Sequence, residues 1–275
     1  MTYLPLTPPG HTPRRVMTIA GSDSGGGAGI QADMRTFAML GMHGLVAVTA
    51  VTVQNSLGVK GFHEVPLDVI AGQIEVVASD IGVQAAKTGM LASSEIIDTV
   101  ATTWSTAAPD VPLVVDPVCA SMHGDPLLHP SALNALKDKL FPLATVVTPN
   151  LDEVRLLTGI DVVDAATQRE AARALHALGP RWALVKGGHL RSSAHSPDLL
   201  FDGADFVEYE AERIDTGDDH GAGDTLAAAI ASALAHGYEV PAAVDFGKHW
   251  VTECLRAAYP LGQGHGPVSA LFRLG

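Results

Sequence analysis

The stretch VMTIAGSDSGGGAG, residues 16–29, places a short β-rich run directly before a glycine-rich loop. A helical pattern follows over residues 29–40, where apolar side chains recur at Ile30, Met34 and Phe37. A strand, a turn and a helix in this order form the unit from which α/β proteins are built. Glycines allow positive φ angles and let the backbone approach a ligand closely. We therefore expect this stretch to begin the central sheet and to line a ligand site.

The same alternation runs through the rest of the chain. Apolar runs predict strands over residues 45–53, 83–87, 113–116, 145–148 and 182–186, and the density of Val and Thr in the first of these is typical of a strand buried on both faces. Three-to-four spacing predicts helices from Pro66 and over residues 94–103, 223–236 and 241–258, and an antiparallel pair is expected at 199–202 and 206–209. The pattern predicts an α/β fold, a mostly parallel central sheet with helices on both faces. We expect one domain over residues 14–275 after a flexible tail at residues 1–13.

Composition excludes several classes of function. The 275 residues contain 17 Lys+Arg against 30 Asp+Glu, and a net charge of −13 argues against binding to nucleic acid, which requires a basic face. Two cysteines do not make a disulfide framework. The first fifteen residues do not read as a secretory signal, and no apolar run approaches the roughly 18 residues that a membrane span needs. We expect a cytoplasmic protein that binds no membrane.

The glycine run does not fit three glycine motifs of known function. Its glycines lie too far beyond the strand for a dinucleotide fingerprint, and no Lys is present for a phosphate-binding P-loop. The peptide Asp23-Ser24-Gly25-Gly26 is similar to a trypsin-like nucleophile peptide, but those proteases are disulfide-bearing β-barrels. Asp23 and Asp33, within and beside the run, favour hydrogen bonding to a ligand, while an ordinary tight turn is the alternative.

A second motif, DTGDDHGAGDT at residues 215–225, leads into an Ala-rich helix. Small residues at Gly221, Ala222 and Gly223 leave the N–H groups of the helix start free to form an anion hole. Asp224 at the edge of this hole could accept a proton while the N–H groups stabilise phosphoryl charge. The alternative is an acidic residue that only favours the first helical turn.

A third set of polar residues follows the predicted strands. Asp116 and Lys186 end predicted strands, Asn150 lies two positions after another, and Glu153 follows Asn150 by three positions. Oxygen ligands in this arrangement suit Mg²⁺, although Asn and Glu at this spacing also form an ordinary helix capping box. Lys186 could hold a phosphate. The twelve His show no zinc-ligand spacing with Cys partners, so Mg²⁺ is the one metal expected.

These residues resemble the hydroxymethylpyrimidine/phosphomethylpyrimidine kinases of thiamine biosynthesis, within the ribokinase-like superfamily, and their details resemble the actinobacterial form. Seven motifs carry the resemblance, in order, over about residues 14–268: residues 18–33, 49–55, 87–91, 121–125, 148–153, 185–189 and 264–268. The resemblance implies a ribokinase-like kinase, usually a homodimer. Its members use ATP and Mg²⁺ to phosphorylate 4-amino-5-hydroxymethyl-2-methylpyrimidine and then its monophosphate.

The resemblance also implies roles for individual residues. Gln54 would form a hydrogen bond with the edge of the aminopyrimidine ring, Met90 would pack against the ring, and Asp33 would help to orient it. The other implied substrate contacts are Thr52, Asp23 and Gly21. The implied nucleotide contacts are Lys186, Gly188, Asn150 and Thr216. The implied Mg²⁺ ligands, partly through water, are Asp116 and Glu153. Asp224 would be the base, with Gly221, Ala222 and Gly223 forming the anion hole.

Two alternatives remain at this point. Many members of the family carry Cys where this chain has Asp224, whereas pyridoxal kinases share the Asp, so vitamin B6 phosphorylation is the nearest competing function. A catalytically silent regulator on the same fold is the second, although Asp224 in an intact glycine loop argues against it. Because Asp215, Asp218 and Asp219 also crowd the anion hole, ATP could approach only with its charge partly neutralised, which predicts strict dependence on a divalent metal.

Overall fold

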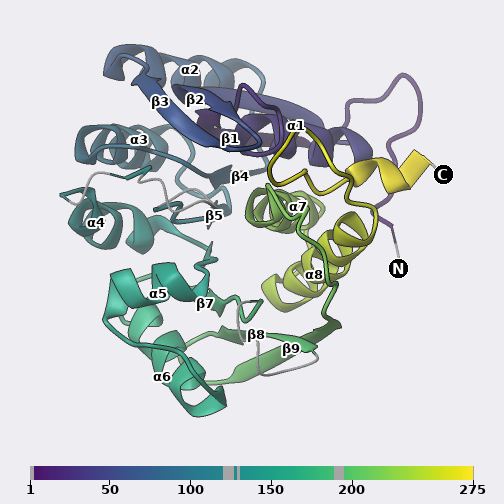
Figure 1. Cartoon of the computed structure of the whole chain (residues 1–275). Coiled ribbons are helices and arrows are strands. Elements are labelled where there is room, and N and C mark those ends of the chain that lie inside the picture. The colour runs from purple at the N-terminus through teal and green to yellow at the C-terminus, as the bar shows by residue number, and fades with distance from the viewer. Residues whose placement is uncertain (1–2, 120–126, 129–130, 189–194, 275) are drawn as a thin grey trace.

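The residues described by the computed structural model, 3–119, 127–128, 131–188 and 195–274, form one sheet of nine strands (Figure 1). Its spatial order is β3-β2-β1-β4-β5-β6-β7-β8-β9. The strands are β1 Arg15–Ser22, β2 His43–Asn55, β3 Gly58–Glu64, β4 Ala85–Thr88, β5 Leu113–Val115, β6 Val146–Val147, β7 Trp182–Val185, β8 His195–Phe201 and β9 Phe206–Glu212. The resemblance motif at residues 121–125 lies outside the described residues.

The six central strands run parallel, from β2 through β1, β4, β5 and β6 to β7. Strands β3, β8 and β9 pair antiparallel at the two edges. The prediction of a mostly parallel sheet is therefore confirmed, as is the antiparallel pair β8–β9. Because parallel strands end at the same edge, the loops after β1, β4, β5, β6 and β7 meet there.

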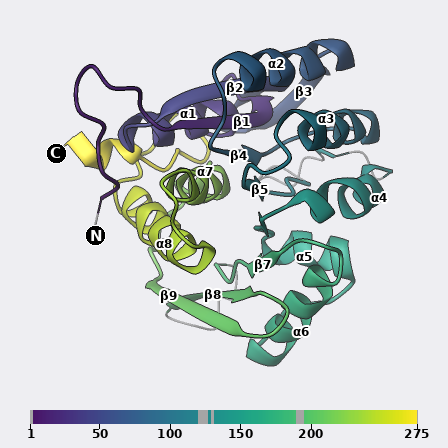
Figure 2. The same cartoon turned by 180° about the vertical axis from the view of Figure 1, so that it is seen from behind.

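Helices cover both faces of the sheet (Figures 1 and 2). The helices are α1 Gly29–Met39, α2 Leu67–Asp80, α3 Ser94–Ala107, α4 Ala132–Ala135, α5 Leu151–Thr158, α6 Ala165–His176, α7 Ala222–Ala235 and α8 Val240–Arg256. Helices α1, α7 and α8 lie on one face and α2 to α6 on the other, each layer with its own apolar cluster. Alternate residues of β1 serve the two clusters, with Val16 in one and Met17 in the other.

Helix α7 is the most enclosed helix of the site. Every residue from Thr225 to Ala235 is buried, and most are alanines, which let the helix pack closely on the sheet and on α8. A Cβ atom at Gly247 of α8 would lie 2.7 Å from the side chain of Ile230, so glycine is needed for this contact. None of the helices in the described ranges is both long and apolar enough to cross a membrane.

Strand β2 differs from its prediction. Its first half is largely enclosed, but Val51 is 50% exposed and Val53 62% exposed, so the prediction of burial on both faces is wrong there. The reason is the hairpin that β2 forms with β3, a strand that the sequence analysis did not identify. The hairpin continues the sheet to its edge, where one face meets solvent.

The first residues contact the body of the molecule. Leu4 is 3% exposed, and the Leu6 side chain lies 2.5 Å from where a Cβ of Gly41 would be. The guanidinium of Arg273 stacks on the ring of Tyr3 at 3.9 Å, which brings the two ends of the chain together. The division into a tail at 1–13 and a domain at 14–275 stays a prediction.

Candidate active site

Two glycine-rich loops interlock at the carboxyl edge of the sheet. One follows β1 and the other precedes α7. Gly221 has a φ of 80°, and a Cβ atom there would lie 2.1 Å from the carbonyl oxygen of Gly27. A Cβ atom at Gly27 would in turn lie 2.2 Å from the ring of His220. Gly221 is therefore required by its contact with the backbone of the first loop, and Gly27 by its contact with the His220 ring of the second.

Asp23 shapes the first of these loops. Its carboxylate accepts N–H groups from Gly25, Gly27 and Ala28 at 2.7 to 2.9 Å, and the ring of His220 lies 3.1 Å away. Burial raises the pKa of Asp23, but the bonds from His220 and from the loop backbone outweigh it and hold the pKa below its ordinary value. The Asp23 carboxylate is thus occupied by hydrogen bonds within its own loop and with His220. The contact of Asp23 with the substrate stays a prediction.

Asp224 lies where the two loops meet. Its Oδ2 accepts the N–H of Gly29 at 3.0 Å, and its Oδ1 lies 2.9 Å from the ammonium of Lys87. Burial raises the pKa of Asp224, but the charge and hydrogen bond of Lys87 outweigh burial and lower it. The carboxylate is therefore ionised at neutral pH, as a general base must be.

Lys87 also binds Asp33, which lies behind Asp224. Asp33 is completely buried; its two oxygens lie 3.1 Å from the Lys87 ammonium, and it accepts the Thr18 hydroxyl at 2.6 Å. Burial raises the pKa of Asp33 to about 7 against the opposing charge of Lys87. The predicted role of Asp33, direct orientation of a ring, would require this carboxylate to leave its enclosed position.

The start of α7 has the character of an anion site. No side chain caps this helix within the described part of the chain, and its N-cap is Gly221. The N–H of Ala222 bonds the Asp219 carbonyl at 3.1 Å, which closes the turn. A Cβ atom at Gly223 would lie 3.3 Å from the carboxylate of Asp116. The helix start therefore presents its dipole and uncapped first turn to the polar residues at the strand ends.

Asp116 and Lys186 form an ion pair beside the helix start. The Lys186 ammonium lies 3.1 Å from Asp116 Oδ1, which also accepts the Thr148 hydroxyl at 3.1 Å. Burial lowers the pKa of Lys186, but the charges of Asp116 and Glu153 outweigh it and raise it. This cation is therefore permanently charged and lies within reach of an anion at the first turn of α7.

Asn150 and Glu153 form the capping box that the sequence left as an alternative. Asn150 Oδ1 accepts the Glu153 N–H at 3.0 Å, and Glu153 Oε2 accepts the Asn150 N–H at 2.8 Å. Burial and then the charge of Asp116 raise the pKa of Glu153 to about 7, although Lys186 opposes them. The arrangement does not exclude Mg²⁺, because Glu153 remains next to Asp116. Oxygen donors of this kind suit Mg²⁺ held partly through water, although no three acidic, His or Cys side chains of the described residues gather as a complete metal site.

The turn after Lys186 depends on a buried ion pair that the sequence analysis missed. Asp198 accepts the N–H of Gly187 at 2.8 Å and binds the Lys248 ammonium at 2.8 Å. A Cβ atom at Gly187 would lie 1.8 Å from the carbonyl of Pro197, which explains the glycine. In the sequence, the only sign of this ion pair is that Asp198 lies in an apolar strand and Lys248 on an apolar helix face, where an unpaired charge would be costly.

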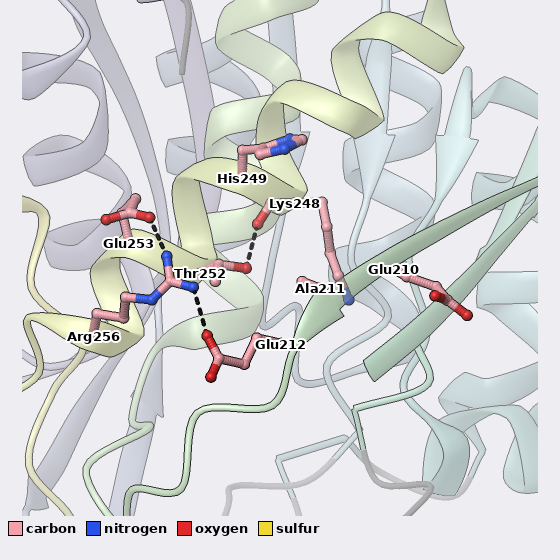
Figure 3. Close-up of a pocket in the computed structure, with 8 residues that line it drawn as sticks. All are labelled: Glu210, Ala211, Glu212, Lys248, His249, Thr252, Glu253 and Arg256. Atoms are coloured by element: carbon pink, nitrogen blue, oxygen red, sulfur yellow. Dashed lines mark hydrogen bonds and ion pairs between the residues drawn. The ribbon is translucent and has the colours of Figure 1, made fainter. Parts of the chain in front are cut away.

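Lys248 also borders a charged groove of about 170 Å³ between β9 and α8 (Figure 3). Figure 3 shows Arg256 reaching both Glu253 and Glu212, the latter at 3.1 Å. The residues that line the groove are Glu210, Ala211, Glu212, Lys248, His249, Thr252, Glu253 and Arg256. Neither Asp224 nor any predicted nucleotide residue lines this groove, and Lys248 connects it to Asp198, which holds the turn after Lys186.

The predicted substrate residues gather around the first glycine loop. The backbone N–H of Gln54 donates to the Ser24 hydroxyl at 2.9 Å, and its side-chain amide lies 3.3 Å from the His220 ring. Thr52 donates to the Ser22 carbonyl at 3.0 Å. A Cβ atom at Gly21 would lie 3.1 Å from the sulfur of Met90, so these two residues are in contact.

Two predicted nucleotide residues lie on the loops that flank Lys186 and α7. Gly188 follows the turn that Asp198 holds, and its carbonyl accepts a bond from Arg213. The Thr216 hydroxyl accepts the N–H of Asp218 at 3.0 Å, which stabilises the loop before α7. Their contacts with a nucleotide stay predictions.

The segment at residues 264–268 fastens the second loop to the β2–β3 hairpin. Gly264 donates to the Ser56 hydroxyl at 3.2 Å, and Gly266 donates to the Asp218 carboxylate at 2.8 Å. The carbonyl of Gly266 accepts the N–H of His220 at 3.1 Å. The contribution of this motif is thus to close the loop that leads into Asp224.

Comparison with known proteins places the chain among vitamin-precursor kinases. Residues 23–269 match the model of the phosphomethylpyrimidine kinase family. A hydroxymethylpyrimidine/phosphomethylpyrimidine kinase of Mycobacterium tuberculosis is 74% identical over 274 residues, covering 100% of both chains. The ADP complex of Bacillus subtilis pyridoxal kinase has a TM-score of 0.87 at 36% identity, covering 96% of this chain and 100% of that one. A phosphomethylpyrimidine kinase of Clostridium difficile has a TM-score of 0.77 at 40% identity, covering 87% and 98%.

Proposed function

The chain belongs to the phosphomethylpyrimidine kinase family, and we propose that Asp224 is the general base of its first phosphoryl transfer, the one to the hydroxymethyl oxygen. It is a ribokinase-like phosphotransferase of thiamine biosynthesis, which phosphorylates 4-amino-5-hydroxymethyl-2-methylpyrimidine and then its monophosphate with ATP. The observation that carries the proposal is the ionised Asp224 carboxylate at the uncapped first turn of α7. A proton acceptor and an anion site thus lie within one helical turn.

The proposed transfer is an in-line displacement. Asp224 takes the proton of the substrate hydroxyl, whose oxygen then bonds the γ-phosphorus. The bond from that phosphorus to the bridging oxygen breaks, and ADP leaves with the electron pair. The N–H groups at the start of α7 and the Lys186 ammonium stabilise the negative charge that develops on the phosphoryl oxygens.

We propose that Asp116 and Glu153 hold Mg²⁺, partly through water. Their oxygen donors and their position beside Lys186 and the start of α7 support this assignment. When bound, Mg²⁺ would neutralise charge on the β- and γ-phosphates. Gly188, Asn150 and Thr216 are proposed nucleotide contacts, since they lie on the loops around Lys186 and α7.

For the substrate, we propose that Gln54, Met90, Thr52 and Gly21 surround the pyrimidine ring. They gather beside the loop that carries Asp23, whose hydrogen bonds fix the loop shape. His220 contacts both Asp23 and Gln54, so we assign it to fixing the Gln54 amide as well as packing the turn.

We also propose that the kinase is a cytoplasmic homodimer. The exposed valines of β2 and the 57% exposed Leu57 form an apolar strip on the β2–β3 hairpin that a second copy could cover. Light scattering after size-exclusion chromatography tests the stoichiometry. A monomer at micromolar concentration would contradict the homodimer.

The test of the proposed function compares substrates and an Asp224 variant. Wild type should phosphorylate the pyrimidine alcohol and its monophosphate with a higher kcat/KM than pyridoxal. Turnover of the monophosphate distinguishes the two functions, because only the pyrimidine kinase is expected to accept it as a substrate. The Asp224→Ala variant should retain its circular dichroism spectrum and lose at least about 10²-fold in kcat. Near-wild-type turnover by the folded variant would remove Asp224 from its assigned role.

A further inference from the structure

Lys87 is a fully buried cation that the proposed mechanism does not yet use. It lies on β4 with 0% exposure, and its ammonium contacts Asp33 and Asp224 at 3.1 and 2.9 Å. A buried ammonium is costly unless it is paired, and here two carboxylates surround it. The group is therefore specifically placed.

The sheet register explains how four elements converge on this ammonium. Thr18 of β1 and Lys87 of β4 are paired positions in neighbouring parallel strands, so both side chains project to the same face. That face is covered by α1, which supplies Asp33, and by α7, which supplies Asp224. A continuous polar chain results, from the Thr18 hydroxyl through Asp33 and Lys87 to Asp224.

This row of polar side chains contacts the Asp224 carboxylate on one side, and the first residue of α1 contacts it on the other. Lys87 binds Oδ1, and the N–H of Gly29 binds Oδ2. Each carboxylate oxygen keeps a further lone pair for a proton, so the two contacts fix the orientation of the group without blocking it. A Cβ atom at Gly89 would lie only 3.1 Å from the Lys87 ammonium, so a larger residue at position 89 would press on this contact.

We propose that Lys87 is a positioning residue for phosphoryl transfer, which orients the Asp224 carboxylate toward the substrate hydroxyl while Asp33 supplies the balancing charge. The proposal rests on the assigned role of Asp224 as the base. Misplacement of a reacting group by about 1 Å can cost on the order of 10²-fold in rate.

The surrounding charges explain why removal of Lys87 alone would not separate its positioning role from its effect on stability and on the protonation of Asp224. Asp116 and Lys186 lie beside the preceding Gly223, and His220 faces Asp224 from the loop before α7. Without Lys87, Asp33 and Asp224 would be left as two buried carboxylates without their shared cation, which disfavours their joint ionisation. The Lys87→Met variant alone could therefore lose activity by unfolding or by protonation of Asp224.

The experiment accordingly uses the double variant Asp33→Asn/Lys87→Met. Assayed at pH 8, where the Asp33 carboxyl is ionised, it removes one positive and one negative charge, keeps Asp224 as the remaining carboxylate, and replaces Asp33 with a residue of the same shape. If Lys87 positions Asp224, this folded variant should lose about 30- to 100-fold in kcat, while KM for ATP and for the pyrimidine alcohol stays within about threefold. A double variant with kcat within about threefold of wild type would overturn the proposal, because Lys87 would then only balance Asp33.

Two controls separate the outcomes. Ile97→Ala, in α3 on the other face of the sheet, should lower the urea midpoint of unfolding without changing kcat at 25 °C. Asp224→Asn reports on the base itself. If Asp224→Asn retains activity, the base and the positioning role both fall. If Asp224→Asn is inactive and the double variant is fully active, the base stands and the positioning role falls.

Discussion

The backbone N–H of Gly29 lies 3.0 Å from the carboxylate of Asp224, although 195 residues separate them in the chain. This bond joins the loop after β1 to the loop before α7. Because Lys87 holds the other oxygen, the orientation of Asp224 depends on α1 and β4 as well as on its own helix. Changes in the loops should therefore affect the rate as well as stability.

Gly221→Ala should reduce both stability and kcat. The residue has a φ of 80°, and its new Cβ would overlap the Gly27 carbonyl at 2.1 Å. We expect a loss of about 2 kcal/mol or more in the free energy of unfolding, measured in urea, and a lower kcat because the start of α7 must shift. Gly217→Ala, in the same loop with open space around its Cβ position, is the matched control. Equal behaviour of the two variants would contradict the interlocking of the loops.

Asp33 should make the fold less stable as the pH rises from about 4 to about 7. Its pKa is raised from an ordinary 3.8 to about 7, chiefly by burial. Between these values the folded state binds a proton that the unfolded state has lost, so the free energy of unfolding falls with rising pH and levels off above pH 7. Urea unfolding of wild type and Asp33→Asn at pH 5, 6, 7 and 8 isolates this contribution. Wild type should lose stability relative to the variant from pH 5 to pH 7 and little more at pH 8, and parallel curves would contradict the assignment.

Asp198→Asn should weaken ATP binding more than it slows the chemical step. The substitution weakens the pairing of the buried Lys248 ammonium and perturbs the acceptor of the Gly187 N–H, so the turn that carries Lys186 loosens. We expect KM for ATP to rise by about tenfold with kcat within about threefold. Asp205→Asn, on the exposed β8–β9 turn, should leave both constants unchanged. A selective fall in kcat would show that the turn serves the chemical step instead.

Turnover should depend strictly on a divalent metal, and Glu153→Gln should raise the Mg²⁺ concentration needed for half-maximal rate by about tenfold. Gln keeps the capping box at the start of α5, so the fold is preserved while the ligand charge is lost. Initial rates over a Mg²⁺ titration measure the effect, with the exposed Glu170→Gln of α6 as control. Equal rates in EDTA and in Mg²⁺ would contradict the metal assignment.

The sequence was most informative where local pattern determines structure. The predicted helices over 29–40 and 223–236 end within one residue of α1 and α7, because caps and apolar spacing are local properties. Strand β3 was missed, since GVKGFHE has two glycines and little alternation, and its pairing with β2 supplies what its own residues do not.

The candidate site divides in the same way. Asp116, Lys186 and Asp224 stood out because they follow strands or open a helix, and parallel strands bring such positions together. The pairs that Lys87 makes with Asp33 and Asp224 span 54 and 137 residues, and that of Lys248 with Asp198 spans 50. No local pattern indicates which carboxylate will meet a buried cation, so these contacts could be found only in the folded molecule.

The bonds from residues 264–268 to Ser56 and to the loop at 218–220 have a consequence for synthesis on the ribosome. The strands and both glycine loops are translated well before Gly264, so a nascent chain can assemble its sheet while the loop before α7 still lacks its fastening. We therefore expect the loop before α7 to reach its final conformation only after residues 264–268 have left the exit tunnel.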